Sequence, residues 1–178
     1  MHIEYEVRVL EIDKEDIIKR LEKLGAVKIG EYDYKRYVYD MKPNKKGQWL
    51  RLRTDGVKNT LTYKNILEDK IDGTRELEIS VSDFNLTNEM LEIMGYRHKG
   101  YQENRRIQYE LNGVEIDIDS WPMIPTYLEI EGGNSLEVMD IVNKLDLDKD
   151  KMTVLGVSDI YLKIYDIDID SIKELMFK

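Results

Sequence analysis

The sequence predicts an α+β protein: a closed or nearly closed eight-stranded antiparallel β barrel (a tunnel) with a charged interior and helices packed outside. Short segments alternate apolar and charged residues, which is the pattern of strands whose two faces meet different surroundings. Turn-forming pairs such as Asp55-Gly56 and Asn112-Gly113 separate these segments and favour tight hairpins. Four amphipathic segments of helical period need an apolar surface on which to pack.

Each element can be placed from this pattern. The strands are expected at residues 2–10, 30–40, 49–54, 58–65, 74–82, 97–110, 113–120 and 126–132. Asp13 is a plausible N-cap for a first helix that ends before Gly25. Further helices are expected at 87–94, at 135–145 and from near Asp170 onward.

Composition restricts the class of protein. The 178 residues suit a single domain spanning 1–178. A net charge of −9 argues against general nucleic-acid binding, because phosphate backbones favour clustered cations on an accessible face. There is no cysteine, and the charged amino terminus resembles neither a signal peptide nor a membrane span. A cytoplasmic location without membrane contact is therefore expected.

The orientation of the charged rows decides what kind of site is present. One interpretation leaves these rows in solvent and fills the barrel with apolar side chains, as in many half-exposed antiparallel sheets. However, four amphipathic helices must also bury their apolar stripes, and the outer face of the sheet is the natural surface for them. If the helices cover that face and the sheet closes, the charged rows point inward.

A charged lumen implies a ligand, because isolated buried ions cost many kcal/mol unless they pair or bind something. Carboxylates two residues apart on one strand, as in Glu129 and Glu131, place oxygen ligands side by side and suit Mg²⁺ or Mn²⁺. Arginine and lysine rows, as in Arg51 and Arg53, provide donors for phosphate oxygens. Both signs in one cavity match a polyphosphate bound together with metal.

Several motifs in order resemble the CYTH, or triphosphate tunnel, family of class IV adenylate cyclases, thiamine triphosphatases and inorganic triphosphatases. The family's opening Glu-x-Glu-x-Lys corresponds to Glu4-Tyr5-Glu6-Val7-Arg8. The further elements are Leu50-Arg51-Leu52-Arg53, Leu61-Thr62-Tyr63-Lys64, Arg75-Glu76-Leu77-Glu78, Arg105-Arg106, the acidic strand ending at Asp119, and Tyr127-Leu128-Glu129-Ile130-Glu131-Gly132. The resemblance runs from Met1 to about Tyr165.

The resemblance assigns roles to individual residues. It implies metal binding by Glu4, Glu6, Glu78, Glu129 and Glu131, and substrate binding by Arg8, Arg51, Arg53, Lys64, Arg75 and Arg105. The expected catalytic residues are Glu4, Glu6, Arg8 and Asp119. A regular strand would turn Arg106 away from the lumen if Arg105 points inward, and Arg75 would need a β-bulge to join Glu76 and Glu78 inside.

Three positions depart from the family pattern. Arg8 stands where the family has lysine, so a planar fork replaces a compact ammonium. Glu103 lies two residues before Arg105, where many members carry another lysine. The segment from Ser158 to Tyr161 lacks the basic residue that some triphosphatases place before the serine and tyrosine. Fewer cations in the tunnel would suit a less highly charged substrate.

The sequence therefore predicts a metal-dependent enzyme that uses Mg²⁺ or Mn²⁺ and hydrolyses a nucleoside, organic or inorganic triphosphate, such as ATP, thiamine triphosphate or tripolyphosphate. One alternative is a class IV adenylate cyclase that converts ATP to cyclic AMP and pyrophosphate. Another is a non-catalytic module that binds nucleotide or polyphosphate, with Arg8 marking lost activity. A purely structural protein is the remaining alternative, and the resemblance further points to homodimers.

Overall fold

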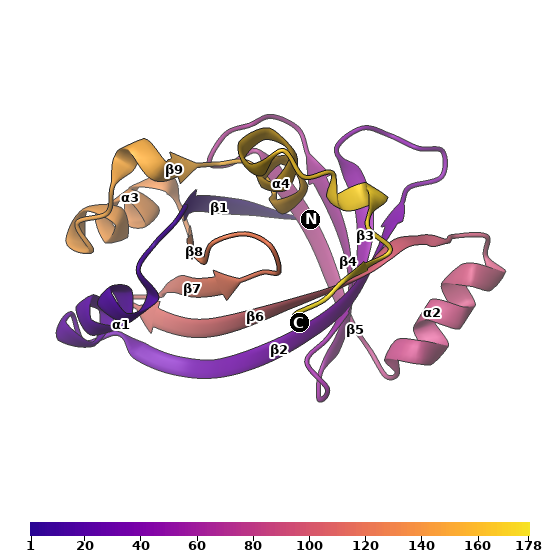
Figure 1. Cartoon of the computed structure of the whole chain (residues 1–178), viewed down its shortest axis with the longest axis horizontal. Coiled ribbons are helices and arrows are strands. Elements are labelled where there is room, and N and C mark those ends of the chain that lie inside the picture. The colour runs from indigo at the N-terminus through magenta and orange to yellow at the C-terminus, as the bar shows by residue number, and fades with distance from the viewer.

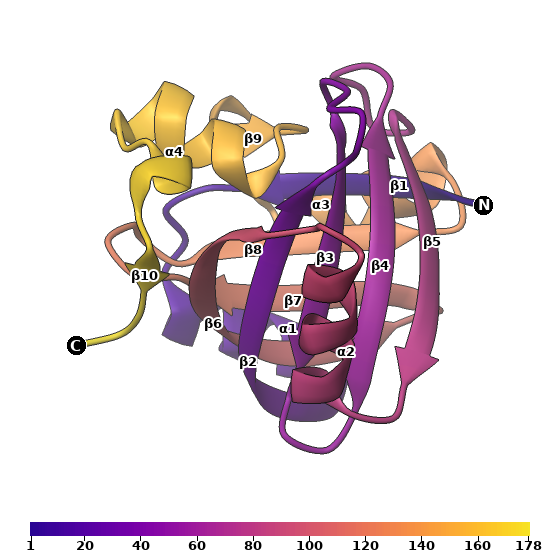
Figure 2. The ribbon, with the colours of Figure 1, turned by 90° about the vertical axis from the view of Figure 1, so that its right-hand side faces the viewer.

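The computed structural model describes residues 1–178 and contains a closed barrel of eight antiparallel strands, as predicted (Figures 1 and 2). The barrel strands are β1 (His2–Val9), β2 (Val27–Asp40), β3 (Gln48–Thr54), β4 (Asn59–Ile66), β5 (Thr74–Val81), β6 (His98–Leu111), β7 (Val114–Ser120) and β8 (Tyr127–Gly132). They pair in the order β1-β5-β4-β3-β2-β6-β7-β8, and β8 pairs with β1 to complete the ring. Two short strands lie outside this ring: β9 (Met152–Thr153) pairs with β1, and β10 (Glu174–Leu175) pairs with β6.

Four α-helices accompany the barrel: α1 (Lys14–Lys23), α2 (Phe84–Ile93), α3 (Ser135–Lys144) and α4 (Val157–Tyr165). The predicted helix from Asp170 is wrong, because residues 169–171 form a single 3-10 turn capped by Asp168, and the chain then adds β10 to the sheet. The helix missed by the prediction is α4. Val157, Ile160, Tyr161 and Ile164 have helical spacing, and Ile160 and Tyr161 are fully buried, but the prediction interpreted this segment only as a motif.

The hairpin between β6 and β7 shows how the turn residues set the register. Asn112 and Gly113 both have positive φ angles, of 56° and 80°, as a two-residue hairpin loop with matching twist requires. Leu111 then pairs with Val114, and the ladder continues without a shift to Arg105 and Ser120. Because the register is continuous, alternate residues of both strands keep to one face throughout.

The apolar residues of the strands point outward, and α1, α2 and α3 cover many of them, whereas Leu77 and Ile79 on β5 stay exposed. The largest cluster packs the outer faces of β1, β6, β7 and β8 against α1 and α3, with Ile116, Leu128 and Ile130 fully buried. At the other end of the molecule, α2 covers Tyr39 and Leu52 (Figures 1 and 2). A third cluster joins α4 to Trp121 and Tyr127 on the cavity side of the barrel. The first two clusters therefore stabilise the barrel by apolar packing on its outside.

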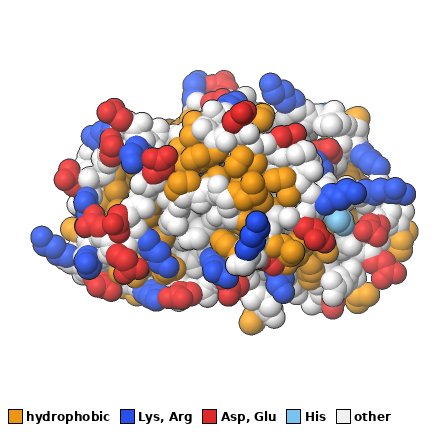
Figure 3. All heavy atoms as spheres, viewed as in Figure 1, with side chains coloured by type: hydrophobic (Ala, Val, Ile, Leu, Met, Phe, Trp, Pro, Cys, Tyr) orange, Lys and Arg blue, Asp and Glu red, His pale blue; other side chains and the backbone are white.

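The face around α4 carries exposed apolar side chains. Figure 3 shows apolar side chains gathered near the middle of this face, in the region of α4, with acidic and basic side chains around them. Leu162 and Ile164 of α4 are both exposed to a substantial degree. No helix in the structure has the length and apolar character needed to cross a membrane.

Candidate active site

The charged rows of the strands line the inside of the barrel, as the sequence predicted. On β1, Glu4, Glu6 and Arg8 are all buried, although they are the polar positions of an alternating strand. The lumen opens into a cavity of about 780 Å³. The lining includes residues from β1 to β6, from the loops after β2 and β4, and from α4.

Neighbouring strands β3 and β4 supply a basic wall. Arg51 and Arg53 on β3 and Lys64 on β4 point into the lumen, where each lies within 4 Å of a carboxylate of β5. Lys64 Nζ lies 2.8 Å from Glu76 and 2.9 Å from Glu4 on β1. Burial, reinforced by Arg51, lowers the pKa of Arg53 to about 10. Cations placed side by side on adjacent strands are suited to bind several phosphate oxygens at once.

Arg8 connects the opening motif to the acidic wall. Its Nη2 atom lies 2.9 Å from Glu6 and 2.6 Å from Glu129, and its Nη1 atom donates a hydrogen bond to the carbonyl of Leu155. The guanidinium thus binds two carboxylates and the backbone just before α4, a set of contacts that a single lysine ammonium could make only in part. The replacement of the family's lysine is therefore accommodated by planar, multi-dentate pairing.

The carboxylates on β1 and β8 lie opposite one another. Glu6 pairs in register with Glu131, and Arg8 pairs with Glu129. Burial, together with the charges of Glu129 and Glu6, raises the pKa of Glu131 to about 7. Burial also raises the pKa of Glu4 to about 8, with Glu6 and Glu76 acting in the same direction and Lys64 opposing them.

Excess negative charge in this corner of the lumen fits a hard divalent cation. Glu131 forms no ion pair in the structure, whereas Glu4 and Glu6 have basic partners in Lys64 and Arg8. No three acidic or histidine side chains are gathered at metal-binding distance in this arrangement. The donor set is nevertheless all oxygen and partly uncompensated, which is the chemistry that Mg²⁺ and Mn²⁺ prefer.

We expect the free energy of unfolding of the metal-free protein to fall as pH rises from about 4.5 to 8. Glu131 and Glu4 hold protons in the folded chain at pH values where the unfolded chain has lost them, so the folded state binds more protons in this window. Thermal melts at pH 5.5 and 8.0 should show a decrease in Tm of roughly 3 °C or more. Added Mg²⁺ or Mn²⁺ should restore part of the loss at pH 8.0. A Tm that rises across this interval would contradict the assignment.

Glu78 on β5 lies beside the basic wall. Its Oε2 atom accepts a hydrogen bond from Thr62 at 2.8 Å and lies 3.6 Å from Arg51. Arg53 approaches the same atom at 3.8 Å. Glu78, an expected metal ligand, thus lies on β5 near the arginines of β3. The other expected ligands Glu129 and Glu131 lie on β8, which pairs with the acidic strand β1.

A second charged cluster surrounds Arg106, at the end of the lumen formed by β6, β7 and β8. The guanidinium pairs with Asp117, with Asp119 at 2.6 Å and with Glu129 at 3.0 Å. Asp119, expected as a further acid of the site, is held here and also accepts a hydrogen bond from Asn104. Burial raises the pKa of Asp117 to about 10 even though Arg106 opposes it.

The prediction that Arg105 points into the lumen is wrong, and the residue that points inward is the next one along the strand. The Arg105 side chain is 63% exposed, lies 3.3 Å from Asp33 and stacks on Phe177 outside the barrel. Arg106 takes the inward position instead, and Asn104 occupies the position two residues earlier. The alternation along this strand could have shown this. The apolar residues Ile107, Tyr109 and Leu111 lie an even number of residues from Arg105, so they share its face of the strand, and they pack outside the barrel.

Arg75 also lies outside the lumen. It donates hydrogen bonds to the backbone carbonyls of Asp72 at 2.7 Å and Thr74 at 3.2 Å. The pairing of β5 with β4 is continuous, so the bulge needed to bring Arg75 inward is absent. Arg75 therefore shares the outer face with Leu77 and Ile79.

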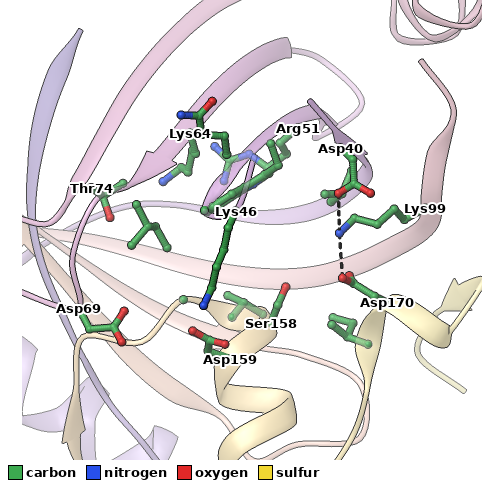
Figure 4. A pocket seen from close by; sticks show the side chains of 18 of the residues that line it. Asp40, Lys46, Arg51, Lys64, Asp69, Thr74, Lys99, Ser158, Asp159 and Asp170 are labelled. Atoms are coloured by element: carbon green, nitrogen blue, oxygen red, sulfur yellow. Dashed lines mark hydrogen bonds and ion pairs between the residues drawn. The ribbon is translucent and has the colours of Figure 1, made fainter. Parts of the chain in front are cut away.

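The mouth of the cavity brings the segment that begins at Ser158 together with residues that the sequence did not indicate. Figure 4 shows Lys46 extending across the cavity toward Ser158 and Asp159 at the start of α4. Lys99 bridges Asp40 at 3.0 Å and Asp170 at 2.8 Å on one side of the opening (Figure 4). Asp40 and Lys99 lie at the ends of β2 and β6, whereas Lys46 and Asp170 lie between strands and Ser158 and Asp159 on α4, whose placement no strand pattern reveals.

Arg36 on β2 was missed as well. It is buried in the lumen and lines the same cavity. Its neighbours Tyr37 and Tyr39 pack on the outer face, so the alternation of β2 could have indicated that Arg36 points inward.

Comparisons with known proteins agree with this geometry. A family model described as the CYTH domain matches residues 2–161. A Methanocaldococcus jannaschii protein, named as a proposed adenylate cyclase, is 26% identical over 164 residues, which cover 84% of this chain and 93% of that protein. A solved structure from Pyrococcus horikoshii is 26% identical with a TM-score of 0.77, covering 86% of this chain and 96% of the other.

A more distant structure shares the fold alone. It comes from Hippeastrum, is 14% identical with a TM-score of 0.64, and covers 94% of this chain and 97% of its own. That protein is described as a proposed adenylyl cyclase with a dominant triphosphatase activity.

Proposed function

Because this chain belongs to the CYTH family, we propose that it is a metal-dependent enzyme that hydrolyses a triphosphate-bearing substrate inside its barrel. The observation that carries the proposal is the division of the lumen into two walls. Arg51, Arg53 and Lys64 form a basic wall on β3 and β4, and β1 and β8 carry the acidic residues Glu4, Glu6 and Glu131. A triphosphate with a bound cation would satisfy both walls together.

The basic wall would position the phosphates. Phosphoryl transfer needs mainly positioning and neutralisation of charge, and fixed cations in a partly dry site supply both without a covalent nucleophile. Arg51, Arg53 and Lys64 are all largely buried, so their interaction with phosphate is less screened than on the surface. Each would exchange a carboxylate partner for a phosphate oxygen when substrate binds.

The acidic wall would hold the cation and handle the proton. Mg²⁺ or Mn²⁺ bound there would neutralise charge on the phosphate oxygens. Glu131 has no basic partner, and its pKa of about 7 in the metal-free protein leaves a substantial fraction ionised near neutral pH, so it could accept a proton from an attacking water. We assign the role of general base to Glu131 rather than to Asp119, because Arg106 binds both oxygens of the Asp119 carboxylate.

A class IV adenylate cyclase is the second candidate, and the name of the Methanocaldococcus jannaschii relative favours it. Trp49 lines the cavity and offers a flat apolar surface on which an adenine ring could stack. In this reaction the ribose hydroxyl, rather than water, attacks the phosphorus nearest the ribose, and pyrophosphate leaves.

The products distinguish these candidates. Purified protein would be incubated with ATP, thiamine triphosphate and tripolyphosphate, each with Mg²⁺ or Mn²⁺, and the products separated by ion-exchange chromatography. We expect inorganic phosphate with the corresponding diphosphate, and no product when metal is chelated. Cyclic AMP with pyrophosphate would establish the cyclase instead, and pyrophosphate from ATP without a cyclic product would contradict both.

Binding without turnover under any metal would support the non-catalytic module. In that case Arg8→Lys, which restores the residue of the family motif, should be tested for recovered turnover. Recovery would show that Arg8 causes the loss of activity.

A further inference from the structure

Arg36 is a buried cation without an acidic partner. Only 7% of the residue is exposed, and its Nη2 atom donates a hydrogen bond to the side-chain oxygen of Asn104. The guanidinium carbon lies 4.5 Å from the ring centroid of Trp121, in a cation–π arrangement. The Nε atom is buried and has no hydrogen-bond partner.

The basic side chains that β1, β3, β4 and β6 direct into the lumen are paired. A carboxylate lies within 4.0 Å of Arg8, Arg51, Arg53, Lys64 and Arg106. The surroundings of Arg36 are instead mainly positive. Arg51, Arg53 and Arg106 repel its charge, Asp119 attracts it, and burial with these cations keeps the pKa of Arg36 well below its ordinary value.

An unpaired buried cation is expensive to maintain in a fold, and proteins compensate it with a counter-charge or a ligand. Arg36 lines the main cavity of the barrel, so an anion can reach it. The amino terminus of α4 borders the same cavity at Gly156 and Ser158. The N-cap residue Gly156 provides no side-chain acceptor, which leaves the positive end of the helix dipole to favour an anion there.

The strand register makes Arg36 an extension of the basic wall. Arg36 is the direct cross-strand partner of Arg53, and β3 is paired in turn with β4, which carries Lys64. Arg51 opposes Thr62 on β4, and Lys64 lies two residues beyond Thr62, so Lys64, Arg51 and the Arg53–Arg36 pair form a diagonal row across the three strands. Within that row, the backbones of Arg53 and Arg36 are separated by the spacing of neighbouring strands, about 5 Å. Phosphates held by Lys64 and Arg51 would occupy one end of the row, and a longer phosphate chain would reach Arg36 at the other end.

We propose that Arg36 is a further phosphate-binding residue, which contacts the end of a triphosphate chain and makes the site prefer three linked phosphates over two. This inference rests on the proposed function for the identity of its ligand. Trp121 would fix the plane of the guanidinium, and Asn104 would orient its fork. The Nε hydrogen is then available to a phosphate oxygen.

The test is a binding measurement that does not depend on turnover. Calorimetry with tripolyphosphate and with pyrophosphate, in chelator and without added metal, would compare the wild type with Arg36→Gln and Arg36→Lys. We expect Arg36→Gln to weaken tripolyphosphate binding at least about 10-fold, the loss of one charge-assisted contact, and to change pyrophosphate binding much less. Arg36→Lys, which keeps the charge and loses the fork, should lie between.

Two controls separate binding from folding. Arg105→Gln removes an arginine from the outer face of the barrel and should leave both affinities unchanged. The ligand-free Arg36→Gln protein should melt at or above the wild-type Tm, since it loses an unpaired buried charge; a structural role for Arg36 would lower that Tm.

Equal loss of both ligands, no loss of either, or a wild type that binds neither would overturn the inference. Failure of the wild type to turn over any triphosphate would refute the proposed function but not the preference measured in chelator.

Discussion

Arg106→Gln is expected to lower the free energy of unfolding by about 3 to 5 kcal/mol, the usual cost of removing one partner from a buried ion pair. Arg106 is the only basic side chain within 4 Å of Asp117 and Asp119, and its own side chain is 13% exposed. Without it, the buried side chains of Asp117 and Asp119, two residues apart on the same side of β7, would have no basic partner. Urea unfolding followed by circular dichroism would measure the loss.

Arg105→Gln is the matched control, because it changes the same residue type one position away on the same strand. The Arg105 side chain pairs with Asp33 in solvent, so its replacement should change stability by less than about 1 kcal/mol. Equal effects of the two substitutions would show that Arg106 does not hold the acidic cluster together.

Arg51→Gln is expected to reduce kcat/KM for tripolyphosphate by about 100-fold or more, as the removal of a preorganised charge from a phosphoryl-transfer site commonly does. The fold should survive, because Glu76 keeps its pair with Lys64 and Glu78 remains near Arg53. Steady-state phosphate release with saturating Mg²⁺ would measure the change, and circular dichroism would verify the fold.

Arg97→Gln provides the comparison, since Arg97 is exposed and the substitution removes the same charge from the whole protein. Its kcat/KM should match that of the wild type. An Arg51→Gln enzyme with unchanged kcat/KM would remove the basic wall from the proposed mechanism.

The strands and the inward orientation of their charged rows could be predicted because both follow from a local period of two residues. All eight strands were expected close to their observed bounds, and Glu4, Glu6 and Lys64 point inward as the alternation indicated. The resemblance to a family added the order of the motifs. Local pattern and family motif agreed most closely on β1, where three charged residues alternate with apolar ones.

The errors arose where a motif was preferred to the alternation around it. On β6, the pair Arg105-Arg106 was aligned by residue type, although Ile107 and Tyr109 determine which of the two faces outward. Arg36 escaped notice because it belongs to no expected motif and its significance depends on the absence of an acid nearby. Such a three-dimensional absence cannot be inferred from one strand alone. The position of α4 at the cavity likewise depends on tertiary packing against Trp121.

The outward placement of the apolar side chains affects how the barrel tolerates ligand exchange. In most barrels of this size, packed side chains fill the interior, and a ligand can enter only by displacing them. Here Ile116, Leu128 and their neighbours pack against α1 and α3 on the outside of the barrel. A ligand can therefore enter and leave the lumen while these packing contacts stay intact. Ligand exchange in the lumen therefore need not reduce the stability of the fold.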